Sequence, residues 1–294
     1  PVLLTASVQP KQTRTAWLIA SAETLADQVN RIGRAGSAAQ ERRQRALQFL
    51  QGETLPVEVA WVTAASGATL ADLQLLAEKD LIALGETEIW RDPLAQISPA
   101  AYQAPALTGG QQTVLARVVD GLRQPPAAQA PSPYLLHGVT GSGKTEIYLQ
   151  AAAEALRQGR QVVILVPEIS LTPQTVRRFL GRFPGQVGLV HSQLSPGERY
   201  DTWRRARMGL LNVIVGPRSA LFTPLPRLGL IIVDECHDDS YYQDDFSPVY
   251  HAVQAALAYA RITRSVLLLG SATPDIGLYH RAEREHWHLL ELPD

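Results

Sequence analysis

The residues best suited to chemistry lie in the segment Gly138-Val-Thr-Gly-Ser-Gly-Lys-Thr145, which has the spacing of a phosphate-binding loop. Its glycines let backbone N–H groups turn toward an anion, and a helix that starts after it adds a favourable dipole. We expect Lys144 to reach the β- and γ-phosphates of a nucleotide and the Thr145 hydroxyl to bind Mg²⁺. The alternative is a glycine-rich turn without a ligand, which the Lys-Thr pair at this spacing disfavours. The residues predicted to bind ATP in this loop are Gly138, Val139, Thr140, Gly141, Ser142, Gly143, Lys144 and Thr145.

A pair of carboxylates, Asp234 and Glu235, follows the apolar run Leu230–Val233. Phosphoryl transfer depends on positioning and charge neutralisation more than on covalent help. We therefore predict that Asp234 binds Mg²⁺, through water, and that Glu235 orients and polarises the attacking water. An Asp-Glu pair alone is usually surface charge, and its place at the end of a buried strand is what favours catalysis. With Lys144, these two residues form the predicted catalytic set.

Two small hydroxyl residues, Ser271 and Thr273, follow the apolar run Val266–Leu269 in the same way. Hydroxyls at the edge of a sheet can hydrogen-bond the Asp-Glu pair and respond to the state of the nucleotide. By itself, Ser-Ala-Thr carries almost no information. After the other two motifs it indicates the helicase and translocase class, in which Ser271 and Thr273 couple ATP chemistry to movement along a nucleic-acid strand.

These motifs need a scaffold that brings them together. After residue 133, apolar runs alternate with amphipathic helices, and the runs are continuous, as in strands buried on both faces. We predict an α/β fold for residues 111–294, a P-loop NTPase (RecA-like) parallel sheet with helices on both faces. The predicted strands are Tyr134–Leu136, Val162–Val166, Val187–Val190, Val213–Val215, Leu230–Val233 and Val266–Leu269.

The first part of the chain predicts a smaller domain of another kind. Helices are predicted over Ala38–Leu50, Pro56–Val62 and Ala68–Lys79, and a hairpin is predicted around Gly85. This order is typical of a small α+β winged helix-turn-helix domain, which we place at residues 38–92. Residues 1–37 then form a remnant or linker, and the Pro- and Ala-rich residues 93–110 form a second linker.

Whether this domain contacts DNA is left open by its sequence. The third helix of such a domain commonly enters a groove of duplex DNA, but here its polar side is acidic, so the alternative is a role in packing alone. An arginine cluster offers contacts to phosphates, or is only a solvated helix face. The cluster comprises Arg31, Arg34, Arg42, Arg43 and Arg45.

Composition excludes several classes of protein. The 27 Lys and Arg residues and 28 Asp and Glu residues give a formal net charge of −1, which excludes nucleic-acid binding by a basic tail but not by local basic faces. The single cysteine, Cys236, excludes a disulfide framework and a cysteine-rich zinc site. No signal peptide and no membrane-spanning apolar run is visible. We expect a cytoplasmic monomer with no membrane contact, cut at both ends from a longer protein.

Several further runs give the sequence a specific resemblance. They are Leu-Val-Pro-Glu-Ile-Ser-Leu-Thr-Pro-Gln at 165–174, Arg-Ser-Ala-Leu-Phe at 218–222, and His191-Ser192 with Glu198-Arg199 and Trp203. With the three motifs above, the chain resembles the primosomal protein N′ (PriA) family, superfamily 2 DNA helicases of bacterial replication restart. The resemblance is dense over residues 107–275, and a winged helix fits the layout of the same family.

The resemblance implies roles for further residues. Gln111, after Leu107-Thr108, resembles the adenine-reading segment, and Thr172, Gln174, Arg218 and Ser219 resemble motifs that grip the single-strand backbone. The loop 239–251 resembles an aromatic-rich loop that links DNA binding to hydrolysis. Its rings either stack on unpaired bases or pack beneath the loop. The residues of this loop that we assign to DNA binding and coupling are Tyr241, Tyr242 and Phe246.

The resemblance also implies partners and an activity. It implies ATP-dependent 3′-5′ helicase or translocase activity on forked and single-stranded DNA, with primosome proteins and single-strand binding protein as partners. Zinc, a second motor lobe and its arginine finger are expected only outside this stretch. Because an arginine finger contributes about 10³–10⁵ in rate, we expect this chain to bind ATP–Mg²⁺ but to hydrolyse it poorly.

The sequence departs from the pattern of the family at several positions. Cys236 replaces a usual Glu, Tyr242 a usual Lys and Pro217 a usual Thr, and Ala-Val-Gln follows His251 in place of Ala-Arg-Asp. These departures favour an alternative function, a nucleotide-gated DNA-binding scaffold of the primosome with a weakened motor. An RNA helicase is a weaker alternative, because its family carries Asp-Glu-Ala-Asp at the position of 234–237.

Overall fold

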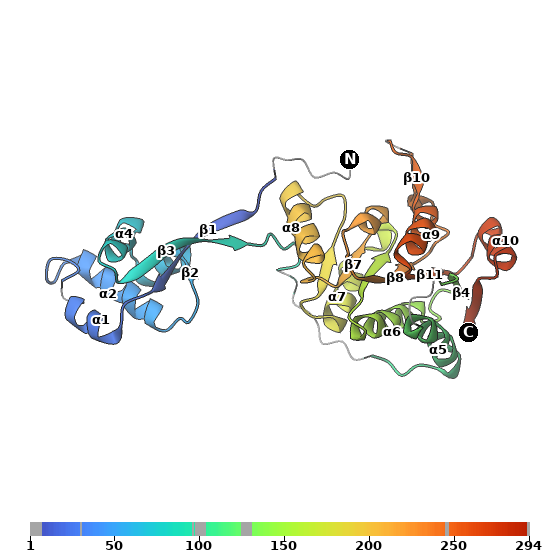
Figure 1. Cartoon of the computed structure of the whole chain (residues 1–294), viewed down its shortest axis with the longest axis horizontal. Coiled ribbons are helices and arrows are strands. Elements are labelled where there is room, and N and C mark those ends of the chain that lie inside the picture. Colours follow the sequence, from blue (N-terminus) through green and yellow to red (C-terminus); the bar gives the residue numbers. More distant parts are fainter. Residues whose placement is uncertain are drawn as a thin grey trace. The chain divides into compact units, whose positions relative to one another are not determined.

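The structure is a computed structural model that describes residues 8–29, 31–95, 97, 104–124, 131–244 and 247–292. The chain divides into two compact units, a smaller one over Gln9–Trp90 and a larger one that starts at Arg91 (Figure 1). The smaller unit contains one cluster of buried apolar residues, and the larger unit contains two.

The larger unit is built on a seven-stranded sheet in the order β12-β4-β11-β8-β5-β7-β6. Every neighbouring pair of its strands is parallel, which confirms the predicted parallel sheet. All the predicted strands are present, and the strand-like C-terminal segment forms β12 beside β4. The strands are β4 (Tyr134–Gly138), β5 (Gln161–Leu165), β6 (Val187–Leu189), β7 (Val213–Gly216), β8 (Leu228–Val233), β11 (Val266–Ser271) and β12 (His288–Leu292).

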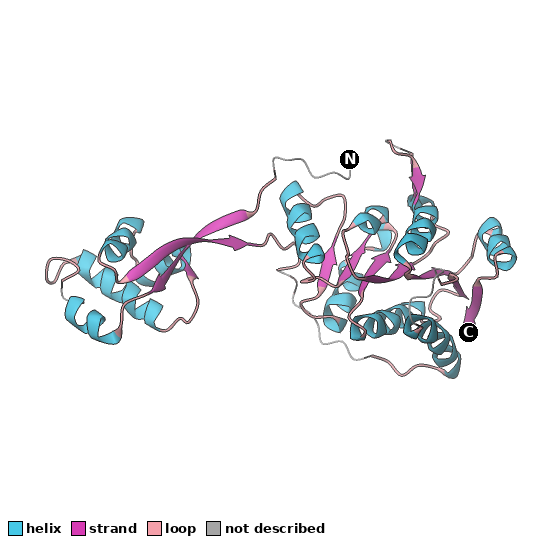
Figure 2. Ribbon diagram, in the orientation of Figure 1, coloured by secondary structure: helices cyan, strands magenta, loops and turns pink. Residues whose placement is uncertain are grey.

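Helices cover both faces of this sheet, as expected for strands that are apolar throughout (Figures 1 and 2). Neighbouring strand residues join opposite cores: Ile232 lies in one cluster and Ile231 in the other. Fully burying such a side chain contributes about 1.5–3 kcal/mol, so both helical layers are needed. The first layer is α5 (Gly109–Arg123), α6 (Lys144–Arg157) and α7 (Pro173–Arg182); the second is α8 (Pro196–Arg207), α9 (Ala252–Thr263) and α10 (Ile276–Arg284).

Short elements fill the connections at the carboxyl ends of the strands. Single 3-10 turns follow β5, β7 and β8, and a two-stranded ribbon pairs β9 with β10 before α9. The 3-10 turns are Glu168–Ser170, Arg218–Phe222 and Asp239–Tyr241, and the ribbon is β9 (Tyr242–Gln243) with β10 (Tyr250–His251).

The smaller unit combines helices with a three-stranded antiparallel sheet in the order β2-β1-β3. The helix α2 starts after Ser37, whose side chain accepts a hydrogen bond from the N–H of Gln40. Gly67, with φ +71°, ends α3 in the left-handed conformation that favours glycine. The elements are β1 (Lys11–Leu18), α1 (Ala22–Gln28), α2 (Ala38–Gln51), β2 (Val57–Glu58), α3 (Val59–Ser66), α4 (Leu70–Glu78) and β3 (Ile82–Ile89).

Three expectations for this unit are wrong. Residues 1–37 are not only a remnant or linker, because β1 pairs with β3 from Lys11↔Ile89 to Leu18↔Ile82. There is no hairpin at Gly85, which lies within the continuous strand β3; a Cβ at Gly85 would lie 2.9 Å from the ring of Trp17, so glycine is needed for that approach. The helix predicted from Pro56 starts at Val59, after β2 has paired with β1.

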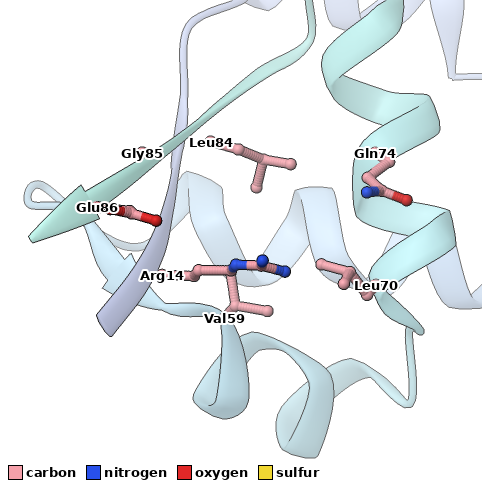
Figure 3. A pocket seen from close by; sticks show the side chains of 7 residues that line it. All are labelled: Arg14, Val59, Leu70, Gln74, Leu84, Gly85 and Glu86. Atoms are coloured by element: carbon pink, nitrogen blue, oxygen red, sulfur yellow. The ribbon is translucent and has the colours of Figure 1, made fainter. Parts of the chain in front are cut away.

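The exposed side of α4 borders a small pocket in this unit. The pocket has a volume of about 250 Å³, and Leu70, Leu84 and Val59 form its apolar part, with Arg14 and Glu86 near them (Figure 3). The helix itself carries no Lys or Arg. Two arginines of the predicted phosphate-binding cluster, Arg42 and Arg43, bind the Asp72 carboxylate of α4 instead. These contacts support the alternative that the sequence left open, in which α4 has a role in packing.

The predicted linker 93–110 is partly built into the larger unit. Leu94 of this segment is buried in the core of the larger unit. The last two residues of the predicted winged-helix domain 38–92 also belong to the larger unit: the N–H of Arg91 donates to Asp201 at 3.0 Å, and Arg205 pairs with Asp92 at 2.7 Å. The helix α5 begins at Gly109, inside the predicted linker, because Thr108 caps it. Of the helices that the structure describes, none alone is long and apolar enough to cross a membrane; α3 and α4 meet that measure only as a pair bent by 106°.

Candidate nucleotide-binding site

The three motifs meet at one edge of the larger unit. Because all the strands are parallel, the loops after β4, β8 and β11 lie at the same edge, where α/β sheets commonly bind ligands. A cavity of about 530 Å³ opens there. It is lined by Pro105, Thr140, Gly141, Gly143, Lys144, Thr145, Glu146, Arg178, Asp234 and Glu235.

The phosphate-binding loop has a backbone that needs its glycines. Gly141 and Gly143 have φ values of +90° and +88°, which are strained for other residues. A Cβ at Gly143 would also lie 2.4 Å from Nε2 of Gln111. That Nε2 donates to the carbonyl oxygen of Ser142 at 2.8 Å, while Oε1 of Gln111 accepts from the N–H of Thr108 at 3.0 Å. The structure therefore places Gln111 against the loop.

Lys144 is the buried cation of the site. Its side chain is 7% exposed, and Nζ donates to the carbonyl oxygens of Gly138 at 2.7 Å and Val139 at 3.2 Å. Nζ also lies 3.8 Å from Oε1 of Glu235. Carbonyl oxygens of the loop thus hold the lysine amino group at the cavity. A phosphate can replace these carbonyl oxygens, because hydrogen bonds to a charged acceptor are stronger.

Asp234 is held from several sides. Burial, and then the neighbouring Glu235 carboxylate, raise the pKa of Asp234 to about 6, although a hydrogen bond from Tyr148 works against this. The Tyr148 hydroxyl donates to Oδ1 at 3.0 Å, and the Tyr241 hydroxyl donates to the backbone carbonyl oxygen of Asp234 at 2.6 Å. A carboxylate whose ionisation is costly in this way favours a nearby cation.

Glu235 connects the carboxylate pair to the third motif. Its backbone has φ +45°, a rare conformation for a residue with a side chain, and no donor among the described residues forms a hydrogen bond with its buried Oε2. His237 Nδ1 lies 3.6 Å from that oxygen and 2.7 Å from the Ser271 hydroxyl. The Ser271 hydroxyl also accepts from the N–H of Thr273 at 3.0 Å. Ser271 therefore reaches Glu235 through His237, whereas the contact of Thr273 with Ser271 is made by its backbone N–H and not by its hydroxyl.

The cavity residues fit a nucleoside triphosphate with a divalent cation. Lys144 and the loop offer N–H donors to phosphate, while the Asp234 carboxylate and Oε2 of Glu235, which accepts no hydrogen bond from the described residues, offer acceptors to a cation or to water. In the part of the chain that the structure describes, no cluster of three or more His, Cys, Asp or Glu residues could hold a metal ion.

The residues assigned to DNA lie along the same edge but do not form one contact set. Thr172 caps α7, with Gln174 exposed beside it, and the Arg218 guanidinium donates to the carbonyl oxygens of Ser240 at 3.1 Å and Tyr242 at 2.7 Å. Ser219 lies in the 3-10 turn that Arg218 begins. Arg218 therefore ties the turn after β7 to the aromatic-rich loop.

The aromatic rings of that loop divide between surface and interior. Tyr242 is 48% exposed, whereas Tyr241 is 1% exposed and packs beneath the loop, which is the second of the two alternatives given for these rings. Tyr250 packs edge-on against Phe222 at 5.4 Å. Phe246 lies outside the described residues.

Sequence reasoning missed three residues of the site. Arg178 of α7 lines the cavity and adds a second positive charge. Tyr148 could have been found from its place four residues after Lys144, on the same side of α6. Gly270 of β11 leaves space for the Tyr148 ring, because a Cβ there would lie 1.7 Å from the hydroxyl oxygen. A glycine inside an apolar strand run was the available signal.

Comparison with known proteins agrees with this geometry. The sequence matches the DEAD/DEAH box helicase family over residues 110–279. It is 44% identical to replication restart protein PriA of Synechocystis sp. over 262 residues, which cover 86% of this chain and 30% of that protein. It is 38% identical to replication restart protein PriA of Bacillus subtilis over 284 residues, which cover 96% of this chain and 34% of that protein. The resemblance to the PriA family is thereby confirmed.

These relatives are much longer than the chain. The chain spans about a third of the length of the curated relatives it matches. Among solved structures, RecG bound to a three-way DNA junction matches at 22% identity with a TM-score of 0.49, over 65% of this chain and 24% of that one.

Proposed function

Because this chain belongs to the DEAD/DEAH box helicase family, we propose that it forms the winged helix and first motor lobe of an ATP-driven 3′-5′ DNA helicase of replication restart. One observation carries the proposal. The loop lysine, Lys144, and the carboxylates of Asp234 and Glu235 line the same cavity at the carboxyl ends of parallel strands. We place the protein in the bacterial cytoplasm, acting on forked and single-stranded DNA beside primosome proteins and single-strand binding protein.

The residues have distinct roles in this proposal. The loop N–H groups and Lys144 bind and orient the phosphates, and Thr145 and Asp234 hold Mg²⁺. Bound ATP–Mg²⁺ supplies the transferable phosphoryl group and a cation that neutralises its charge. Glu235 orients water through an oxygen that has no other hydrogen bond, and His237 beside it ties this position to Ser271. Arg218 couples the nucleotide edge to the aromatic-rich loop and to DNA.

The test is nucleotide binding by the chain itself. Calorimetric titration of ATP with Mg²⁺ is expected to show one site in the wild type and a loss of at least tenfold in affinity in Lys144→Ala, because the substitution removes the buried charge that faces phosphate. Lys79→Ala, at the end of α4 in the other unit, is the matched control and is expected to bind as the wild type does. Equal affinity of Lys144→Ala and wild type would exclude this cavity as the site.

A second experiment separates the motor from a scaffold. Lys144→Ala in the full-length protein is expected to abolish ATP-dependent unwinding of forked DNA. If replication restart continued unchanged in cells with this variant, the nucleotide-gated scaffold would be the better description. Helicase-like ATP turnover by the present chain alone, stimulated by DNA, would contradict our expectation of weak hydrolysis.

A further inference from the structure

Tyr148 is a buried tyrosine whose hydroxyl points at the carboxylate pair. It lies on α6, one turn after Lys144, and is 1% exposed. Its hydroxyl donates to Oδ1 of Asp234 at 3.0 Å. The ring is fixed from the other side by Gly270, where any Cβ would lie 1.7 Å from the hydroxyl oxygen. The contact therefore needs a residue of α6, the residue that follows β8 and a glycine of β11.

The hydroxyl determines which oxygen of Asp234 remains free. Among the described residues, two donors form hydrogen bonds with this carboxylate, and both bind Oδ1: the hydroxyl of Tyr148 and the backbone N–H of Glu235, at 3.0 Å each. No donor among the described residues reaches Oδ2. A tyrosine hydroxyl has an ordinary pKa of about 10, so near neutral pH it carries its proton and acts as a donor to the carboxylate.

We propose that Tyr148 is a positioning residue for the divalent cation: it fixes the rotation of the Asp234 carboxylate so that Oδ2 stays available to the cavity. The inference rests on the proposed nucleotide site and names a further residue of it. Without the hydroxyl, the Asp234 carboxylate can rotate about its bond to Cβ, and Oδ2 is no longer held toward the cavity. Groups that orient metal ligands in this way change metal affinity by about 10–100-fold when removed.

Tyr148→Phe tests the inference, because it removes one oxygen and keeps the ring. A slowly hydrolysed ATP analogue, adenosine 5′-(γ-thio)triphosphate, is titrated calorimetrically into the whole chain with and without Mg²⁺. Nucleotide affinity without Mg²⁺ is expected to match the wild type, while the gain in affinity on adding Mg²⁺ falls about tenfold. Tyr134→Phe is the matched control, since Tyr134 is also buried but its hydroxyl donates to the carbonyl oxygen of Arg117, away from the site.

Each outcome bears on the inference in a different way. A Mg²⁺-dependent gain in Tyr148→Phe equal to that of the wild type and of Tyr134→Phe would overturn it, with the nucleotide site intact. No Mg²⁺-dependent gain in the wild type would overturn the proposed site and the inference together. Equal losses with and without Mg²⁺ would show a general packing role and also overturn it.

A double-mutant cycle with Asp234→Asn provides a second, independent measurement. If Tyr148 acts through Asp234, adding Tyr148→Phe to Asp234→Asn changes the Mg²⁺ dependence no further. An additional loss of similar size in the double variant would place the action of Tyr148 elsewhere. Thermal unfolding of each variant without nucleotide shows whether it is folded at the temperature of titration.

Discussion

Replacing Asp72 by Asn is expected to destabilise the smaller unit strongly. Asp72 is 2% exposed, and its carboxylate accepts from Arg43 Nε at 2.8 Å, Arg42 Nε at 3.0 Å and the N–H and hydroxyl of Thr69. Burial opposes its ionisation, yet the hydrogen bonds from Thr69, Arg42 and Arg43 together lower the pKa of Asp72 from 3.8 to about 2. The ionised form is therefore the one that the fold favours.

The size of the effect follows from that difference in pKa. A depressed pKa contributes stability at pH values above the unfolded pKa, and this stability is lost as pH falls toward the folded one. A difference of about 1.8 units at 1.36 kcal/mol each gives about 2.4 kcal/mol at pH 7, which falls to about 1.3 kcal/mol at pH 3. Asp72→Asn is expected to lose about this amount at pH 7, and its deficit relative to the wild type is expected to shrink on acidification.

Hydrogen exchange followed by mass spectrometry can measure this in the whole chain. Peptides from α2 and α4 report on the smaller unit, and peptides from β8 report on the larger unit. Asp27→Asn is the matched control: the pair of Asp27 with Arg31 is 60% and 66% exposed, so its loss is expected to change stability by less than about 0.5 kcal/mol. Equal protection of α2 and α4 in both variants, or a deficit that stays constant from pH 7 to pH 3, would refute the reasoning.

Three further predictions concern the larger unit. Gly143→Ala is expected to weaken ATP binding at least tenfold, by calorimetry, because its Cβ would meet Gln111; Gly159→Ala has a similar φ of +72° with open space around it and is expected to leave binding unchanged. Gly270→Ala is expected to lower the free energy of unfolding in urea by about 1–3 kcal/mol. Adding Tyr148→Phe is expected to restore part of this stability, because it removes the hydroxyl oxygen nearest to the new Cβ; an equal or larger loss in the double variant would contradict this. Cys236 is expected to react with Ellman's reagent far more slowly in the folded chain than in urea, because burial raises the pKa of its thiol to about 12; rapid reaction of the folded chain at pH 8 would contradict this.

The larger unit was predictable from sequence because its signals are local. Continuous, short apolar runs rich in β-branched residues, such as Leu230–Val233, favour strands buried on both faces, and glycine, lysine and carboxylate motifs follow those runs directly. The residues that were missed depend on contacts distant in the chain. Tyr148 gains its partner 86 residues away, and Gly270 leaves space for a ring that belongs to α6.

The smaller unit shows why its strands were harder to predict. β1 has the sequence Lys-Gln-Thr-Arg-Thr-Ala-Trp-Leu, with few apolar residues, and most of its backbone hydrogen bonds depend on β3, far along the chain. The sequence suggested a turn at Gly85 because glycine permits one. In the structure, the ring of Trp17 lies so close to Gly85 that a side chain there would collide with it, which also requires glycine. No local pattern distinguishes these two reasons.

The position of β4 in the sheet has a consequence for synthesis. Its neighbours on the two sides are β11 and β12, which come much later in the chain, and a Cβ at Gly138 would lie 2.9 Å from Leu292 of β12. A nascent chain that has just completed α6 has the whole phosphate-binding loop but no partner strand for β4. Since domains emerge from the N-terminus at about 5–20 residues per second, the loop remains unsupported for several seconds before β12 appears. The phosphate-binding loop is therefore synthesised well before the two strands that flank β4.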